Sequence, residues 1–199
     1  MKKTLFIAVI LLVANTINAQ RPTAHFGIKA GVNVANLKIE NAPDGDSRVG
    51  LHLGGLAHIH IADQFAIQPE IMFSMQGREQ EIGGVEYKTK LSYINIPVLA
   101  QYMFGDGFRL QTGPQFGIMV DAESSANGND TDVSDFYKSL DISWSIGASY
   151  LTSLGLGFDA RYNIGLNNIS DSGPADVNNR VWQFGLFYQF MHNPTHRKK

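Results

Sequence analysis

Long stretches in which apolar and polar side chains alternate are the feature that most constrains the fold of this chain. Eight segments place Val, Ile, Leu, Ala or aromatic side chains at nearly every second position. Successive side chains of a β-strand point to opposite faces, so this period predicts eight strands with one apolar face each. The predicted strands cover residues 26–34, 49–61, 65–76, 93–104, 108–120, 140–150, 156–166 and 182–190.

The length and the second face of these strands favour a membrane protein. A tilted strand needs about 9–11 residues to cross a bilayer, whereas strands of soluble proteins are usually about 5–6 residues long. The face opposite the apolar one carries Gly, Ser, Gln, Asn and charged residues, which suit a small polar lumen. The sequence therefore predicts an all-β fold, an eight-stranded antiparallel up-and-down transmembrane β-barrel.

The connections between the predicted strands alternate between long and short. In outer-membrane barrels the short turns face the periplasm and the long polar loops face outside. An even strand number then places both ends of the barrel in the periplasm. The predicted long loops are Lys38–Arg48, Gly77–Leu91, Asp121–Ser139 and Asn167–Asn179, and the short turns are Asp63–Gln64, Gly105–Gly107 and Leu151–Gly155.

The chain begins with a pattern typical of a secretory signal peptide. Lys2 and Lys3 precede an uncharged apolar run, Leu5–Val13, and Ala19 offers a small residue before a cleavage point. A run of this length is too short for a membrane-spanning helix. We therefore expect a signal peptide at residues 1–19, a barrel at residues 20–190 and a short basic periplasmic tail at residues 191–199, with the mature protein in the cell outer membrane.

Composition excludes several other classes. The chain has no cysteine, which excludes disulfides, thiolate zinc sites and a lipoprotein anchor on cysteine. The formal net charge of −2 gives no broad cationic field, so nucleic acid is not an expected partner.

One local rule is broken, because Pro69, Pro97 and Pro114 lie inside strands that a closed barrel pairs on both sides. We expect β-bulges or bends at these prolines.

Several short motifs resemble the PorT-like outer-membrane β-barrel domains. They are Gln68-Pro69-Glu70, Tyr93-Ile94-Asn95-Ile96-Pro97, Gly113-Pro114 and Asp159-Ala160-Arg161-Tyr162-Asn163-Ile164-Gly165-Leu166 with Asn168-Ile169. The resemblance covers about residues 24–190 and implies an eight-stranded outer-membrane barrel. The family's namesake takes part in protein secretion across the outer membrane, so the resemblance also implies a secretion-associated role. The sequence departs from the family at Asn95, where acidic residues are usual, and in the tail Met191–Lys199 that follows the last aromatic residue.

The polar face contains a balanced set of charges. Lys29, Arg109 and Arg161 stand against Glu70, Asp141 and Asp159, and His58 and His60 share the same face. Charges buried in a small lumen must find partners. We therefore predict that these eight residues pair off into a structural network, with no catalytic residue, no metal ligand and no cofactor.

Two chemical alternatives depend on how the second and third strands pair. A turn at Asp63–Phe65 places His58 opposite Glu70, and a slip by two residues places His60 opposite Glu70. Either arrangement permits a metal site formed by His58, His60 and Glu70. An enzymatic reading would use His52 and Ser74, one diagonal apart near the outer rim.

The functional prediction is a non-enzymatic structural or interaction barrel. Its expected partners are outer-membrane lipid, the barrel-assembly machinery and a protein bound at the extracellular loops, above all at Asp121–Ser139, which we expect to be a solvated loop. Two alternatives are a narrow pore for small solutes and a soluble lipocalin-like binding barrel. A lipocalin would turn the apolar face inward, whereas a membrane barrel turns it toward lipid.

Overall fold

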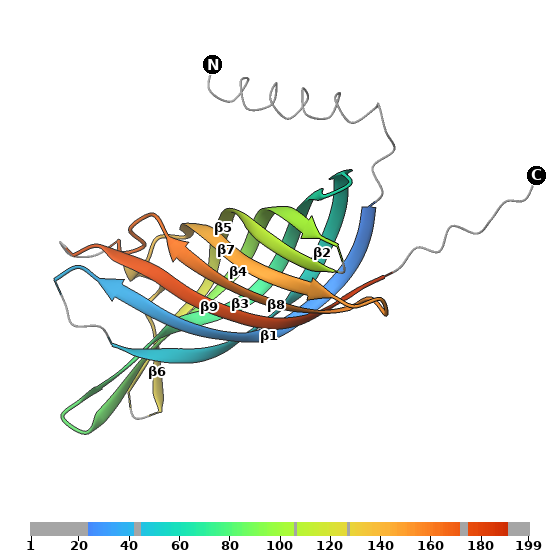
Figure 1. Ribbon diagram of the computed structural model, residues 1–199. Helices are drawn as coiled ribbons and strands as arrows, with labels where there is room; N and C mark the ends of the chain where they lie inside the picture. Colours follow the sequence, from blue (N-terminus) through green and yellow to red (C-terminus); the bar gives the residue numbers. More distant parts are fainter. Residues whose placement is uncertain (1–23, 42–44, 106, 127, 172–174, 191–199) are drawn as a thin grey trace, which may run out of the picture.

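Eight antiparallel strands form a closed ring in the computed structural model, which describes residues 24–41, 45–105, 107–126, 128–171 and 175–190 (Figure 1). The ring strands are β1 (Ala24–Ile39), β2 (Asp46–Ala62), β3 (Phe65–Ile82), β4 (Val85–Phe104), β5 (Phe108–Ala126), β7 (Leu140–Leu151), β8 (Leu156–Gly165) and β9 (Val177–Gln189). A short strand β6 (Asn129–Asp132) pairs with β5 outside the ring, and a 3-10 turn η2 (Ser134–Phe136) follows it.

The ring closes because the first and last strands pair with each other. The order of the strands is β4-β3-β2-β1-β9-β8-β7-β5, and β4 also pairs with β5. Every ring strand therefore has two antiparallel neighbours, and no edge of the ring is left open. The predicted fold class, an eight-stranded antiparallel up-and-down barrel, is confirmed.

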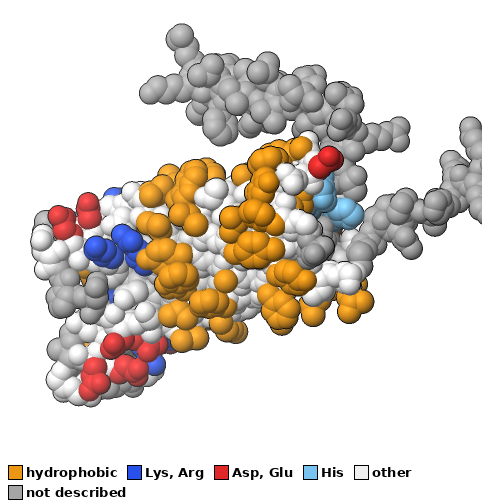
Figure 2. Space-filling view, viewed as in Figure 1, with side chains coloured by type: hydrophobic (Ala, Val, Ile, Leu, Met, Phe, Trp, Pro, Cys, Tyr) orange, Lys and Arg blue, Asp and Glu red, His pale blue; other side chains and the backbone are white. Residues whose placement is uncertain are grey.

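The apolar face of each strand points outward and the polar face points into the lumen. Large side chains such as Leu53 and Ile71 are more than half exposed, whereas Lys29 and Glu70 are almost fully buried. Figure 2 shows hydrophobic side chains over the middle of the barrel and over the end at which β1 begins and β9 ends, with most of the visible charged side chains at the opposite end. This orientation suits contact with lipid, and the lipocalin-like alternative, with its apolar face inward, is wrong.

One predicted loop is a β-hairpin. The region Gly77–Leu91 continues β3 and β4 in unbroken register as far as the pair Ile82 and Val85. Gly83 and Gly84 form the two-residue turn and have φ values of 61° and 78°. Both central residues of a type I′ hairpin turn need positive φ, and glycine meets this demand without strain. The Gly-Gly pair is a sequence signal for this turn.

The region Asp121–Ser139, expected to be a solvated loop, also contains β-strand structure. Strand β5 runs on to Ala126, and β6 returns beside it with Asp132 opposite Glu123. The outer segments of β3, β4 and β5 together with β6 form a sheet that extends beyond the ring, at the end opposite the one where β1 begins and β9 ends (Figure 1). We call residues 77–92, 121–126 and 129–132 the flap.

The prolines do not cause the expected bulges. Pro69 pairs with Val98, and the same β3–β4 register continues at Met72 and Asn95. Regular pairs are missing between these positions, so the lost N–H groups are accommodated by a local opening of the ladder rather than by an inserted residue. The register shifts occur instead between Ser47 and His52, between His60 and Ala62, and between Ser92 and Tyr93.

The predicted signal peptide at residues 1–19 and the predicted basic tail at residues 191–199 lie outside the described residues. No helix among the residues that the structure describes is long and apolar enough to cross a membrane.

Labelling of single cysteines tests the orientation of the barrel. We expect a membrane-impermeant maleimide to label Glu81→Cys and Asp171→Cys on intact cells, because both positions are exposed at the flap end. Asp63→Cys and Leu154→Cys lie in turns at the other end and should react only after the outer membrane is permeabilised. The reverse pattern would contradict the orientation.

Candidate functional site

The lumen is filled by polar side chains from all eight ring strands. Because β-strand side chains alternate in direction, the polar half of each strand converges on the barrel axis. The buried polar residues include Lys29, Asn33, His52, His58, Gln68, Glu70, Ser74, Asn95, Gln101, Arg109, Gln111, Gln115, Asp141, Asp159, Arg161, Asn163, Asn179 and Gln183. The side chains that sequence analysis selected as a network are among them, except His60, which is only partly buried.

Four of the predicted charges form a compact buried group, which we call the ionic quartet: Lys29, Glu70, Asp159 and Arg161. Arg161 donates from Nη1 to Glu70 Oε2 over 3.0 Å and from Nη2 to Glu70 Oε1 over 2.8 Å. Its Nε also donates to Asp159 Oδ1 over 3.2 Å, and Lys29 forms an ion pair with the same carboxylate. Two cations and two carboxylates thus neutralise one another across strands β1, β3 and β8.

Two further side chains complete the hydrogen bonding of the quartet. Gln68 Nε2 donates to Glu70 Oε1 over 2.8 Å, and Gln111 Nε2 donates to Asp159. Bidentate guanidinium–carboxylate pairs are among the stronger polar contacts in proteins. The alternation places both glutamines on the polar face, but the sequence does not reveal that they donate to Glu70 and Asp159.

The prediction that all six charges pair off is wrong for Arg109 and Asp141. Arg109 makes two long hydrogen bonds, to His58 Nδ1 and Gln189 Oε1, each of 3.4 Å. Asp141 accepts a hydrogen bond of 2.8 Å from Asn179 Nδ2 and has no ion-pair partner among the described residues. Arg109 and the β5 partner of Asp141, Gly117, are eight residues apart, about 27 Å along a strand, so the two charges cannot meet.

The predicted contacts between histidines and Glu70 are also wrong. The β2–β3 register places Leu56, rather than His58 or His60, opposite Glu70. His58 and His60 instead form an edge-to-face ring pair with centroids 4.6 Å apart. Among the described residues no group of three His, Cys, Asp or Glu side chains could hold a metal ion.

His52 and Ser74 lie directly opposite each other rather than on a diagonal. Asn33 bridges them, because its Oδ1 lies 2.8 Å from His52 Nδ1 and its Nδ2 donates to Ser74 Oγ over 3.0 Å. Gln183 Nε2 donates to the same Asn33 oxygen over 3.0 Å. Asn33 therefore joins β1, β2, β3 and β9, a role that the sequence did not reveal.

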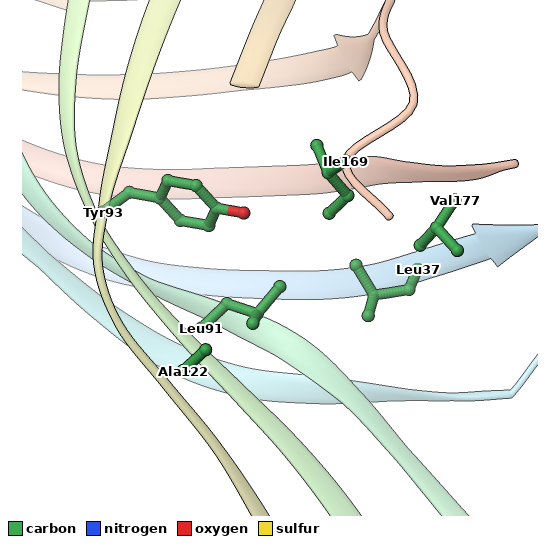
Figure 3. Packing of buried hydrophobic residues seen from close by; sticks show 6 residues of the cluster. All are labelled: Leu37, Leu91, Tyr93, Ala122, Ile169 and Val177. Carbon is green, nitrogen blue, oxygen red and sulfur yellow. The ribbon is translucent and has the colours of Figure 1, made fainter. Parts of the chain in front are cut away.

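An apolar cluster lies at the flap end of the lumen. It consists of Leu37, Leu91, Tyr93, Ala122, Ile169 and Val177, and we call it the apolar cap (Figure 3). Ile169 comes from the connection between β8 and β9, and its backbone is held by hydrogen bonds with Val177 and Lys138 of 2.8 Å and 2.7 Å. The cap excludes water from the polar groups beneath it, since its six members are buried.

The outer face of the flap is acidic. Lys88 forms ion pairs with Glu79 and Glu86, and Lys90 forms ion pairs with Glu123 and Asp130. The register places seven carboxylates on the same face as these two lysines: Glu79, Glu81, Glu86, Asp121, Glu123, Asp130 and Asp132. The excess of negative charge remains after the lysines are paired.

Lys90 and Asp130 illustrate the electrostatics of this flap. Lys90 Nζ donates to both Asp130 oxygens over 2.8 Å. This hydrogen bonding raises the pKa of Lys90 above its usual value and lowers the pKa of Asp130 below its usual value. Both groups therefore keep their charges at neutral pH.

A closed ring of eight strands with an apolar exterior and a polar interior defines a transmembrane β-barrel of the outer-membrane class. The chain belongs to the outer membrane protein beta-barrel domain family, whose model matches residues 18–171. The protein is therefore an outer-membrane protein surrounded by membrane lipid.

Solved structures with the same fold include two small bacterial barrels. Neisserial surface protein A is 16% identical to this chain, with a TM-score of 0.61, and the match covers 84% of this chain and 99% of that chain. The attachment invasion locus protein Ail of Yersinia pestis is 16% identical, with a TM-score of 0.54 and the same coverage. At these identities the likeness concerns the fold alone. No curated protein matches the chain.

Proposed function

We propose that this protein is a non-enzymatic outer-membrane barrel that acts through its extracellular flap, while the polar residues of the lumen stabilise the barrel. The observation that carries the proposal is the flap itself, a four-stranded extension beyond the apolar band with an acidic outer face. Such a surface favours partners with basic segments, because complementary charge accelerates encounter and excludes partners of like charge.

The arrangement of the lumen supports a structural role for Lys29, His58, His60, Glu70, Arg109, Asp141, Asp159 and Arg161. The quartet neutralises itself, so its members are positioned to hold strands together rather than to act on a substrate. The candidate nucleophile, Ser74, accepts hydrogen bonds from Asn33 and Gln76, whereas His52 Nδ1 lies 2.8 Å from Asn33 Oδ1. A serine nucleophile needs a base within hydrogen-bond reach.

Ail has also been solved with sucrose octasulfate, described as a heparin analogue. A sulfated ligand is strongly anionic, and the flap of the present chain carries an excess of the same sign of charge. We therefore do not extend that ligand class to this protein. The PorT-like motifs support a secretion-associated partner, and the alternation from Trp182 to Phe190 supports insertion by the barrel-assembly machinery.

Conductance measurements separate this proposal from the narrow-pore alternative. The ionic quartet and the apolar cap both lie across the route through the lumen. We expect the purified barrel to form no ion-conducting channel in planar lipid bilayers and to admit no small sugar in liposome-swelling assays. Steady single-channel currents that persist in Leu154→Arg, a variant outside the lumen, would favour the pore.

Site-specific crosslinking tests the flap as an interaction surface. A photoreactive amino acid at Glu81 should crosslink a protein partner on intact cells, and the same group at Leu154, in a turn at the other end, should not. Charge reversal by Glu79→Lys and Glu123→Lys should reduce the yield at Glu81 more than tenfold, whereas charge reversal at Asp63 should leave it unchanged. A yield that is insensitive to the flap charges would contradict the proposal.

A further inference from the structure

Asp141 is a buried carboxylate that its neighbours leave without a counter-charge. It lies near the start of β7, beneath the apolar cap, and its side chain is almost fully buried. Asn179 Nδ2 donates a hydrogen bond of 2.8 Å to Asp141 Oδ2, but Asp141 Oδ1 has no hydrogen-bond partner among the described residues. A carboxylate withdrawn from water in this way is costly unless something positive or hydrogen-bonding approaches it.

Two neighbouring amides are left incomplete in the same way. Asn95 on β4 is buried, and neither its Oδ1 nor its Nδ2 has a partner within the described part of the chain. Asn179 on β9 is also buried, and its Oδ1 is without a partner there. Buried polar atoms are nearly always satisfied in folded proteins, so several orphans in one place need an explanation.

The fold brings these three side chains together. Asn95, Gly117 and Asp141 lie in one row of paired residues across β4, β5 and β7. A Cβ atom built on Gly117 would lie 2.7 Å from Asn95 Oδ1 and 3.4 Å from Asp141 Cβ, so both side chains gather over this glycine. Asn179 reaches the same place from β9, since its Nδ2 contacts both Asp141 Oδ2 and, over 3.4 Å, the Tyr93 hydroxyl.

Tyr93 links this polar group to the apolar cap. Tyr93 belongs to the cap, and Figure 3 shows its hydroxyl oxygen pointing away from the strand that carries it. The result is a group of buried oxygen atoms from three strands, with one formal negative charge and an apolar roof. Three other buried cations lie outside the quartet. Arg109 lies about 27 Å away along β5, whereas Arg48 and Arg78 donate to the Gln76 carbonyl oxygen and to Gln80 Oε1, respectively.

The chemistry of this group selects its ligand. Carboxylate and amide oxygens are ligands for hard cations, and a single carboxylate balances a single positive charge. We propose that Asp141, Asn95 and Asn179 bind a monovalent metal cation, sodium, beneath the apolar cap. The ion neutralises Asp141 and is bound by Asp141 Oδ1, Asn95 Oδ1 and Asn179 Oδ1. It thereby links β4, β7 and β9 at the flap end of the lumen.

Sodium-dependent unfolding of the purified barrel tests this site. Trp144 and Trp182 lie on the lipid-facing surface and report urea unfolding by fluorescence. Replacing N-methylglucamine chloride by sodium chloride at constant ionic strength should lower the unfolding equilibrium constant. The decrease should reach about tenfold when the sodium concentration is ten times the dissociation constant. Asp141→Asn, which keeps the size of the side chain, should reduce this decrease to less than twofold.

Two further variants keep the test decisive. Asp121→Asn removes an exposed carboxylate and should respond to sodium as the unchanged protein does. Asn95→Ala removes one ligand and should raise the sodium concentration needed for half of the effect by about tenfold. Equal sodium responses in Asp141→Asn and the unchanged protein would overturn the proposal. So would the absence of any response in the unchanged protein, which is the result expected if water or a proton satisfies Asp141.

Discussion

Arg161→Gln is expected to lower the free energy of unfolding of the barrel by about 3–5 kcal/mol, because it leaves two buried carboxylates without their shared cation. Arg161 makes hydrogen bonds to both Glu70 and Asp159, and all three side chains are almost fully buried. Equilibrium unfolding in urea, followed by tryptophan fluorescence in detergent micelles, measures the loss. A loss below about 1 kcal/mol, the range of an exposed ion pair, would contradict the quartet.

A double-mutant cycle localises the effect. Glu70→Gln combined with Arg161→Gln should cost less than the sum of the single changes, by about 1–3 kcal/mol, because the two groups contact each other. Glu70→Gln combined with His60→Gln should be additive, since the observed register places Leu56 opposite Glu70. Coupling to His60 that disappears on addition of a chelator would instead revive the metal-site alternative.

Leu53→Arg is expected to destabilise the barrel by about 2–4 kcal/mol, the cost of a cation near the middle of the hydrocarbon layer. Leu53 is 61% exposed and points to lipid from the central part of β2. Leu154→Arg is the matched control, because Leu154 is even more exposed, at 77%, but lies in the turn between β7 and β8. We expect this control to cost about 0–1 kcal/mol, as near the membrane interface.

Unfolding from lipid vesicles gives both values under the same conditions. The ratio of the two free-energy costs matters more than either cost alone, since both substitutions replace Leu by Arg. Equal costs at Leu53 and Leu154 would contradict the assignment of the apolar face to lipid.

The strands and their faces were predictable because the signal is local. Eight alternating segments gave the number of ring strands, and the polar half of each gave the contents of the lumen. The exposed fractions of Leu53 and Lys29 agree with that assignment. The flap strands did not show this alternation, because polar strands outside the membrane lack an apolar face. Residues 77–91 therefore resembled a loop.

The pairing of charges was not predictable in the same way. Glu70 and Arg161 are 91 positions apart in the sequence, and their contact depends on the stagger of the strands around the ring. The turn at Asp63 suggested a register for β2 and β3, but a shift between His60 and Ala62 moved the pairing and placed Leu56 opposite Glu70. A displacement of two residues keeps every side chain on its face, so hydrophobicity does not detect it.

The sequence by itself determined that this chain forms an outer-membrane barrel of eight strands, because a period of two along each strand decides which side chains meet lipid. The tertiary structure alone decided which lumen residues meet. It brought Lys29, Glu70, Asp159 and Arg161 into one neutral group and left Asp141 beside Asn95 and Asn179. Those contacts depend on strand stagger and on single register shifts, which act between distant segments and leave no mark on the local pattern.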